Sequence, residues 1–171
     1  GDTTAPGDIV WHEGFVTAAN NGTFTVLTAP GNTSYTTNEV LANEGVPLGA
    51  SSRVVGRRGA AADIAAATGP NSISATALNF TTLGLTAGDW VKLEGFATAA
   101  NNGWCRVSAV AAGLLTFDIV PFGWAAGAAP AGSVDIYMGP ITGTGDTNYT
   151  TTGDPLSSLI SFAVTQPVET I

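Results

Sequence analysis

Apolar and polar residues alternate near the start of this chain in a way that predicts a strand. Val10 and His12 fall on one side of the extended backbone. Ile9, Trp11 and Glu13 fall on the other side. Alternation with a period of two residues is typical of a strand with one buried face. The segment therefore predicts a β-strand that follows a Gly-Asp turn and directs Val10 and His12 toward the core.

The same pattern returns later in the chain as part of an internal repeat. Residues 7–26 align without a gap with residues 88–107, and thirteen of the twenty paired positions are identical. Leu93 then stands where His12 stands in the first copy. Because an internal repeat fixes the unit of architecture, we expect two copies of one β-module.

A structural signature lies between the two strands of each copy. A Gly-Phe pair is followed, after a stretch of small residues, by Asn-Asn-Gly. Asn and Gly tolerate positive φ at low cost, so the triplet predicts a turn, in a loop that is longer than a two-residue hairpin. The signature residues are Gly14, Phe15, Asn20, Asn21, Gly22, Gly95, Phe96, Asn101, Asn102 and Gly103.

One charged position is also kept in both copies, as Glu13 and Glu94. The first interpretation is a carboxylate that accepts hydrogen bonds from backbone N–H groups of the turn. The second is a functional acid shared by the two copies. Paired catalytic carboxylates in glycoside chemistry must lie within about 5–10 Å of each other, and duplicate positions in separate units have no reason to converge. The first interpretation is therefore favoured.

Further segments rich in β-formers complete the two modules. The second strand of each copy contains Phe24 and Val26, or Cys105 and Val107. Residues 59–67 have some helix propensity, but the segment is short and poorly capped, so a strand or an extended linker fits it equally. More strands are predicted at residues 34–40, 52–56, 73–78, 114–119, 134–139 and 156–164. Pairing with a neighbouring subunit is one option for the last of them.

Together these elements predict an all-β fold with two tandem barrel- or sandwich-like repeats, each of the size of a small SH3-like barrel. A C-terminal strand segment follows them. The expected parts are a first repeat at residues 1–58, a connector at 59–75, a second repeat at 76–139, and a loop with a C-terminal strand at 140–171.

The charge balance limits the partners of the chain. Its formal net charge is −8, which argues against a surface built to grip phosphates. Arg53, Arg57 and Arg58 form the one basic cluster, and arginines gathered at a strand end are more typical of ion pairs. No apolar run approaches the ~18 residues of a membrane span.

The residues that could carry chemistry are few. His12 is the only histidine, so the sequence has no His-based metal cluster and no triad with a second base, and His12 is interpreted as a structural residue. Cys105 is the only cysteine and replaces Phe24 of the first copy, so it is interpreted as a small buried hydrophobe. No P-loop occurs. We expect neither an enzyme nor a cofactor.

The four tryptophans leave two interpretations open. Trp11, Trp90, Trp104 and Trp124 would suit a surface on which sugar rings stack. The alternative is packing between the repeats or between subunits, which we favour.

Four segments of the sequence resemble segments of a known protein family. They are Gly14-Phe15 with residues 18–22 (Ala-Ala-Asn-Asn-Gly), residues 53–64, residues 78–85, and residues 88–91. With these segments in this order, residues 7–139 resemble the tail tube proteins of long-tailed bacteriophages.

The resemblance implies a virion structural protein: a tail tube subunit, or part of one, that assembles in the host cytoplasm into a ring or tube that conducts DNA. Its partners would be copies of itself and other phage structural proteins, with transient, non-specific passage of DNA and no membrane. Strand edges would meet between subunits, and an acidic chain would let DNA slide. The alternatives are a capsid decoration or head–tail joining protein, and a surface glycan-binding module.

Overall fold

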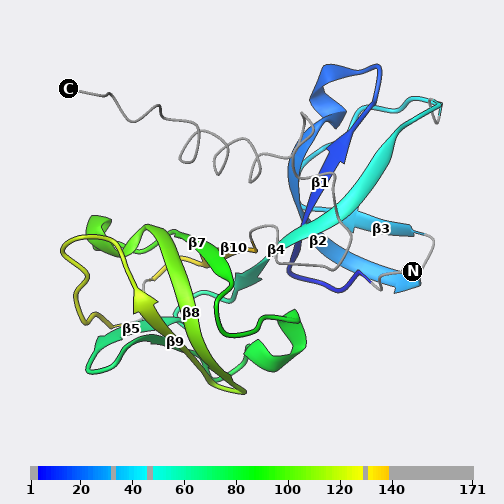
Figure 1. Ribbon diagram of the computed structural model, residues 1–171. Coiled ribbons are helices and arrows are strands. Elements are labelled where there is room, and N and C mark those ends of the chain that lie inside the picture. The colour runs from blue at the N-terminus through cyan, green and yellow to red at the C-terminus, as the bar shows by residue number, and fades with distance from the viewer. Residues whose placement is uncertain (1–3, 32–33, 46–47, 129–130, 139–171) are drawn as a thin grey trace, which may run out of the picture.

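The described part of the chain folds into a single antiparallel β-sheet. The computed structural model describes residues 4–31, 34–45, 48–128 and 131–138. Ten strands lie in the order β3-β2-β1-β4-β10-β7-β8-β9-β6-β5 (Figure 1). The described helices are three short 3₁₀ turns, η1 (Ala18–Asn20), η2 (Phe80–Leu83) and η3 (Ala99–Asn101). The predicted all-β class is therefore confirmed, and one continuous sheet runs through both repeats.

The first repeat supplies four strands. They are β1 (Asp8–Glu13), β2 (Gly22–Gly31), β3 (Ser34–Thr37) and β4 (Ser51–Gly59). β1 lies between β2 and β4, and β3 pairs with the far side of β2. The strands predicted near these positions are present, although β4 continues to Gly59 instead of ending at Gly56.

The second repeat builds the same arrangement with β7 (Trp90–Glu94), β8 (Gly103–Ala111), β9 (Leu114–Ile119) and β10 (Val134–Met138). β7 lies between β8 and β10, as β1 lies between β2 and β4. β9 pairs with the far side of β8, as β3 does with β2. The strand predicted at 114–119 is confirmed, and the two repeated segments fold alike.

Much of the segment assigned to a connector belongs to the sheet. β5 (Ala65–Thr68) and β6 (Asn71–Ser74) form a hairpin whose second strand pairs with β9. The strand predicted at 73–78 therefore begins earlier and ends at Ser74. The reason is tertiary: Ile73 lies opposite Leu115 and both are fully buried, so pairing with β9 sets the position of the strand.

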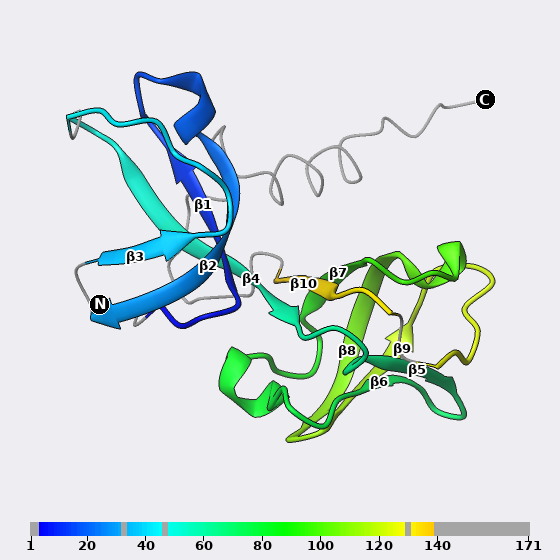
Figure 2. The ribbon, with the colours of Figure 1, turned by 180° about the vertical axis from the view of Figure 1, so that it is seen from behind.

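The two repeats are joined by β4 and β10, which are the last strand of each repeat. β4 pairs antiparallel with β10, from Gly59 opposite Val134 to Gly56 opposite Tyr137. Figures 1 and 2 show β4 running from one half of the molecule into the other. This pairing explains why β4 is longer than the sequence pattern predicts, since its last residues belong to the junction.

The core is divided unequally between the first half of the molecule (β1 to β4) and the second half (β5 to β10). Val10, His12, Val91 and Leu93 are all buried, so the predicted core-facing register is confirmed. The cluster of the second half contains sixteen buried apolar residues, whereas the cluster on the core face of β1 and β2 contains three. The second half therefore holds most of the hydrophobic stabilisation. The strand predicted at 156–164 lies outside the described residues.

Gly56 is the residue at which the junction is most sensitive to added volume. A Cβ at this position would lie 2.6 Å from the carbonyl oxygen of Ile136 on the paired strand. We expect Gly56→Ala to lower the free energy of unfolding by about 1–3 kcal/mol, because the strands would have to separate. Gly132→Ala is the matched control, since a Cβ there meets nothing within 4 Å. Urea unfolding measures both variants, and equal effects would contradict this account of the junction.

Candidate functional site: the loop braces and the junction between repeats

The second asparagine of each signature closes its own loop. Asn21 Oδ1 accepts a hydrogen bond from the backbone N–H of Phe15 at 2.9 Å, and Asn21 Nδ2 donates to the Phe15 carbonyl at 2.8 Å. Asn102 makes the same two bonds to Phe96, both at 2.8 Å. Each side-chain amide thus pairs with a backbone residue as a neighbouring strand would.

The first asparagine of each signature holds a second loop. Asn20 Nδ2 donates to the Ala42 carbonyl at 2.9 Å, and Asn20 Oδ1 accepts from the Ala42 N–H at 2.8 Å. Asn101 makes the equivalent pair with Ala125, both bonds at 2.9 Å. Asn20 and Asn101 are 3% and 1% exposed. We call each Asn-Asn pair with its partners a loop brace.

The braces change the interpretation of the Asn-Asn-Gly turn. Among the described residues Ala62 is the only non-glycine residue with positive φ, so the asparagines do not use their tolerance of positive φ. The glycines do adopt it, with φ of 126° at Gly22 and 146° at Gly103. The asparagines are instead needed because a primary amide can donate and accept in one plane.

The first glycine of each signature permits a close approach of backbones. Gly14 and Gly95 have φ of 80° and 103°. A Cβ would lie 2.6 Å from the Gly49 oxygen in the first copy and 2.4 Å from the Ser133 oxygen in the second. Gly49 lies two residues before β4 and Ser133 lies one residue before β10, so the glycine fixes how the loop enters the last strand of each repeat.

The conserved glutamates of the repeat do not accept hydrogen bonds from the turn, so that expectation was wrong. Glu13 accepts from Ser51 Oγ at 3.1 Å and lies 3.6 Å from Arg53 Nη2. Glu94 lies 2.5 Å from Lys92 Nζ. In the first copy the N–H of Phe15 donates to Asn21, and the N–H groups of Val16 and Thr17 donate to Glu44. Glu13 and Glu94 pair with cations on the sheet surface instead.

His12 lies in the small core of the first half. Its Nε2 lies 2.5 Å from the Tyr35 hydroxyl, which also hydrogen-bonds Ser52 Oγ. The ring stacks near Phe24 with centroids 4.8 Å apart. Burial lowers the pKa of His12 below its ordinary value of 6.5, and a hydrogen bond to the backbone of Asn20 opposes this shift in part. These surroundings favour the neutral ring.

The basic cluster forms ion pairs, as predicted. Arg57 Nη1 lies 2.5 Å from Asp8 Oδ1. Arg58 binds Asp135 through two bonds of 2.7 and 2.8 Å, which tie β4 to β10. The hydrogen bonds that Arg58 donates to Asp135 raise the pKa of Arg58 above its ordinary value. Bidentate pairs of this kind also fix the register of the strands.

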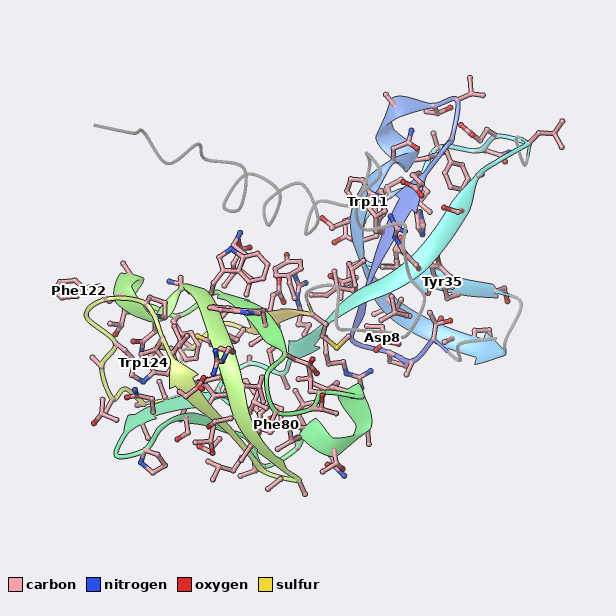
Figure 3. All side chains as sticks on the ribbon, viewed as in Figure 1. Asp8, Trp11, Tyr35, Phe80, Phe122 and Trp124 are labelled. Atoms are coloured by element: carbon pink, nitrogen blue, oxygen red, sulfur yellow. The ribbon has the colours of Figure 1, made fainter. Side chains whose placement is uncertain are left out.

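The tryptophans lie in three different settings. Trp11 and Trp104, one from each repeat, pack with Tyr137 against a small buried cluster at the junction. Trp124 packs on the core of the second half and donates from Nε1 to the Ala67 carbonyl at 2.8 Å (Figure 3). Trp90 is 39% exposed. Trp11 and Trp104 thus serve packing between the repeats.

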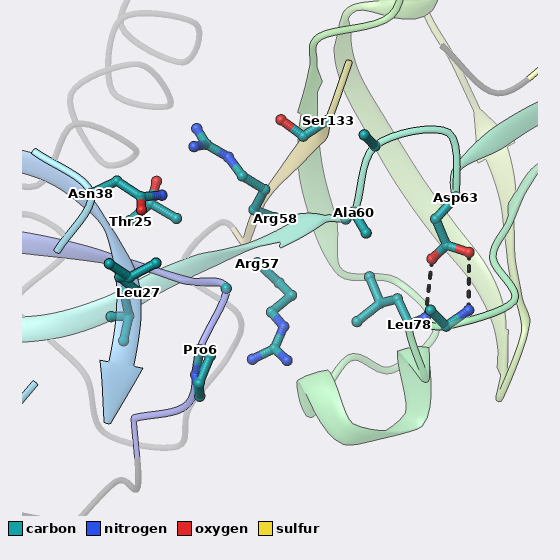
Figure 4. Close-up of a pocket in the computed structure, with 15 residues that line it drawn as sticks. Pro6, Thr25, Leu27, Asn38, Arg57, Arg58, Ala60, Asp63, Leu78 and Ser133 are labelled. Carbon is teal, nitrogen blue, oxygen red and sulfur yellow. Dashed lines mark hydrogen bonds between the residues drawn. The ribbon is translucent and has the colours of Figure 1, made fainter. Parts of the chain in front are cut away.

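A pocket of about 430 Å³ lies beside the junction (Figure 4). Arg57 and Arg58 point away from opposite sides of β4 and both line it. Asp63, on the far wall, accepts hydrogen bonds from Thr76 and from the backbone of Leu78. Burial acts to raise the pKa of Asp63, but these hydrogen bonds outweigh it and lower the pKa to about 2. Each charged group lining the pocket is therefore already engaged by a neighbour.

The described residues offer little for metal or thiol chemistry. None of them form a group of three or more His, Cys, Asp or Glu side chains placed to hold a metal ion. Cys105 is fully buried, as predicted, and burial raises the pKa of its thiol to about 12. Within the same part of the chain, no helix has the length and apolarity needed to cross a membrane.

Comparisons with protein families, with curated proteins and with solved structures found no match for this chain. The interpretation of the site therefore rests on its geometry. That geometry positions loops and joins strands. The two asparagines and the phenylalanine of each signature form equivalent braces, and the two glycines of each signature adopt positive φ beside them. Ala42 and Ala125, the partners of the first asparagines, could not be predicted from the repeat. Both lie in loops whose sequences differ between the two copies.

The loop brace of the second half can be tested directly. Asn101→Ala removes both bonds to Ala125 and leaves the backbone groups of that residue without their partner. We expect a loss of about 1–3 kcal/mol in the free energy of unfolding. Asn43→Ala is the control, since Asn43 is exposed and forms no side-chain hydrogen bond with the described residues. Thermal unfolding measures both, and an Asn101→Ala variant as stable as the control would refute the brace.

His12 predicts a dependence of stability on pH. Because the pKa of folded His12 is lowered, stability is greatest above the ordinary value of 6.5 and falls as the pH drops below it. We expect His12→Leu, which copies Leu93 of the second repeat, to reduce this fall between about pH 7 and 5. Urea unfolding at several pH values measures the slope. An unchanged slope in the variant would show that other groups cause it.

Proposed function

We propose that this chain is a subunit, or part of a subunit, of a phage tail tube, a virion structural protein that assembles with copies of itself into a ring or tube that conducts DNA. The observation that carries the proposal is the edge of β3, which has no partner strand within the described residues and lies at one end of the sheet. Exposed strand edges readily pair with other chains. Copies joined through such an edge in a closed ring would make a tube segment.

The segments that resemble tail tube proteins occupy framework positions. Phe15 belongs to the first brace, and Gly14 before it permits the close approach to Gly49. Residues 53–64 include most of β4 and its pairing with β10. Residues 78–85 contain η2, whose Phe80 is fully buried. This distribution supports a family defined by shape and assembly.

Two tandem barrel-like repeats are the finer architecture that we propose. Support comes from the second half, where Ala66 of β5 forms a bridge with Gly127 in the loop before β10. Trp124 of the same loop bonds Ala67. These contacts curve the strands from β10 to β5 toward a closed, barrel-like module.

The charges suit a conduit for DNA. The chain has five Lys and Arg residues, all of them in the described part. Each forms an ion pair with a carboxylate: Arg53, Arg57, Arg58, Lys92 and Arg106. Affinity for DNA comes largely from cations that neutralise phosphates. A surface whose cations are already paired would let a duplex pass without retaining it.

The glycan-binding alternative has less support, because Trp11 and Trp104 are committed to the junction. A decoration or head–tail joining protein would share the sheet and the charge pattern. Docking of the chain into an electron-density map of a whole particle separates these roles.

Electron microscopy of the purified full chain tests the proposal. We expect rings or tubes of uniform diameter as the protein concentration rises. A gel-shift assay at physiological salt should show no retention of duplex DNA. Particles that stay monomeric at every concentration would count against a tube subunit, and so would tight DNA binding.

A further inference from the structure

The sheet is closed at its β5 end. Ala66 and Gly127 exchange two backbone hydrogen bonds, of 3.2 and 3.0 Å, along the outer edge of β5. Trp124 Nε1 donates to the Ala67 carbonyl on the same strand at 2.8 Å. Another strand therefore has no place to add beside β5.

The opposite end of the sheet is open. β3 pairs with β2 on one side, and within the described residues no other backbone segment bonds to its outer edge. Its sequence, Ser-Tyr-Thr-Thr, carries no Lys and no Pro, the residues with which proteins commonly protect an edge. Tyr and Thr also favour strands. This edge is suited to receive a strand.

The second repeat shows what belongs at that place. β9 is the equivalent of β3, and it is followed in the sheet by β6, which sets Ile73 opposite Leu115. β3 directs Tyr35 and Thr37 inward, where β9 has Leu115 and Phe117. The counterpart of β6 is absent from the described part of the first half.

A strand at this place would enlarge a small core. The cluster of the first half contains only Val10, Phe24 and Val26 as buried apolar residues, with Tyr35 packed against it. An added strand with apolar residues on one face would extend this cluster past Tyr35, as Ile73 does beside Leu115. The strand should therefore alternate apolar and small polar residues.

Within residues 156–164, positions 160–164 have this pattern. Ile160, Phe162 and Val164 share one face of an extended chain with Ser158, and Ser161 lies on the other face with Leu159 and Ala163. The segment follows Met138, the end of β10, after seventeen residues (139–155). An extended linker of that length spans about 50 Å, which is enough to reach a neighbouring molecule.

We propose that Leu156–Val164 of one copy adds as a strand to the β3 edge of the next copy, with Ile160 and Phe162 over the core of the first half. This inference rests on the proposed ring-forming function. If the segment returned to its own β3, it would close the last open end of the sheet. Donation to the next copy makes a heterologous contact, the kind that generates rings when the rotation closes.

Cysteine cross-linking between separately labelled chains tests the donation. One full chain carries Thr36→Cys on the exposed side of β3, and another carries Ser161→Cys. Cys105 can remain, because it is fully buried. After mixing and mild oxidation, we expect a dimer whose disulfide joins positions 36 and 161 of different chains, identified by mass spectrometry. Ser157→Cys, on the same face as Ser161, covers another register.

Ala112→Cys replaces Thr36→Cys in the matched control, since Ala112 is exposed on the β8–β9 turn, away from the edge. A link to β3 at least fivefold more abundant than a link to this control supports the proposal. The absence of a preferred link from both serine positions overturns it. A chain carrying both Thr36→Cys and Ser161→Cys that links only to itself also overturns it.

Electron microscopy separates this inference from the proposed function. Ile160→Asp should abolish rings, while Ser161→Asp on the other face should preserve them. Rings that survive Ile160→Asp, without the cross-link, would refute strand donation and leave the tube subunit standing. Wild-type protein that forms neither rings nor the cross-link would refute both.

Discussion

The structure depends on the rule that a buried amide must have partners for both of its polar atoms. Asn20 and Asn101 are almost completely buried, and each satisfies its carbonyl and its amino group on one residue of a distant loop. An unpaired buried polar group would cost about 1–3 kcal/mol. Moving the loop away from its asparagine would therefore destabilise the fold. Loops that lack regular structure are thereby held in the same place in both repeats.

β4 and β10, the last strands of the two repeats, also join the repeats by pairing with each other. β4 and β10 are equivalent, yet their mutual pairing is what makes one sheet of two modules. Arg58 and Asp135 lie opposite each other at this seam and bind in a bidentate pair. The junction thus combines backbone pairing, which is indifferent to sequence, with one charged pair that selects the register.

The sequence predicted what depends on local pattern. The strand at 114–119, the burial of Cys105 and the pairing of the arginines follow from alternation, substitution within the repeat and charge. The role of Asn20 did not follow, because its partner Ala42 lies in a loop with no signature of its own. Residues 59–67 fit a helix, a strand or a linker equally on sequence, since an alanine-rich run has little preference. Pairing with β6 decides that Ala65–Thr68 form a strand.

The unequal division of the core has a consequence for synthesis. The ribosome releases the first half before the second, yet the first half contains the smaller cluster and its strand β4 is completed by β10. Its last backbone partners therefore do not exist until translation has passed Met138. Until then the nascent chain exposes strand edges, the state most open to wrong pairing. The pairing that joins the two repeats can therefore form only after the second half has been released.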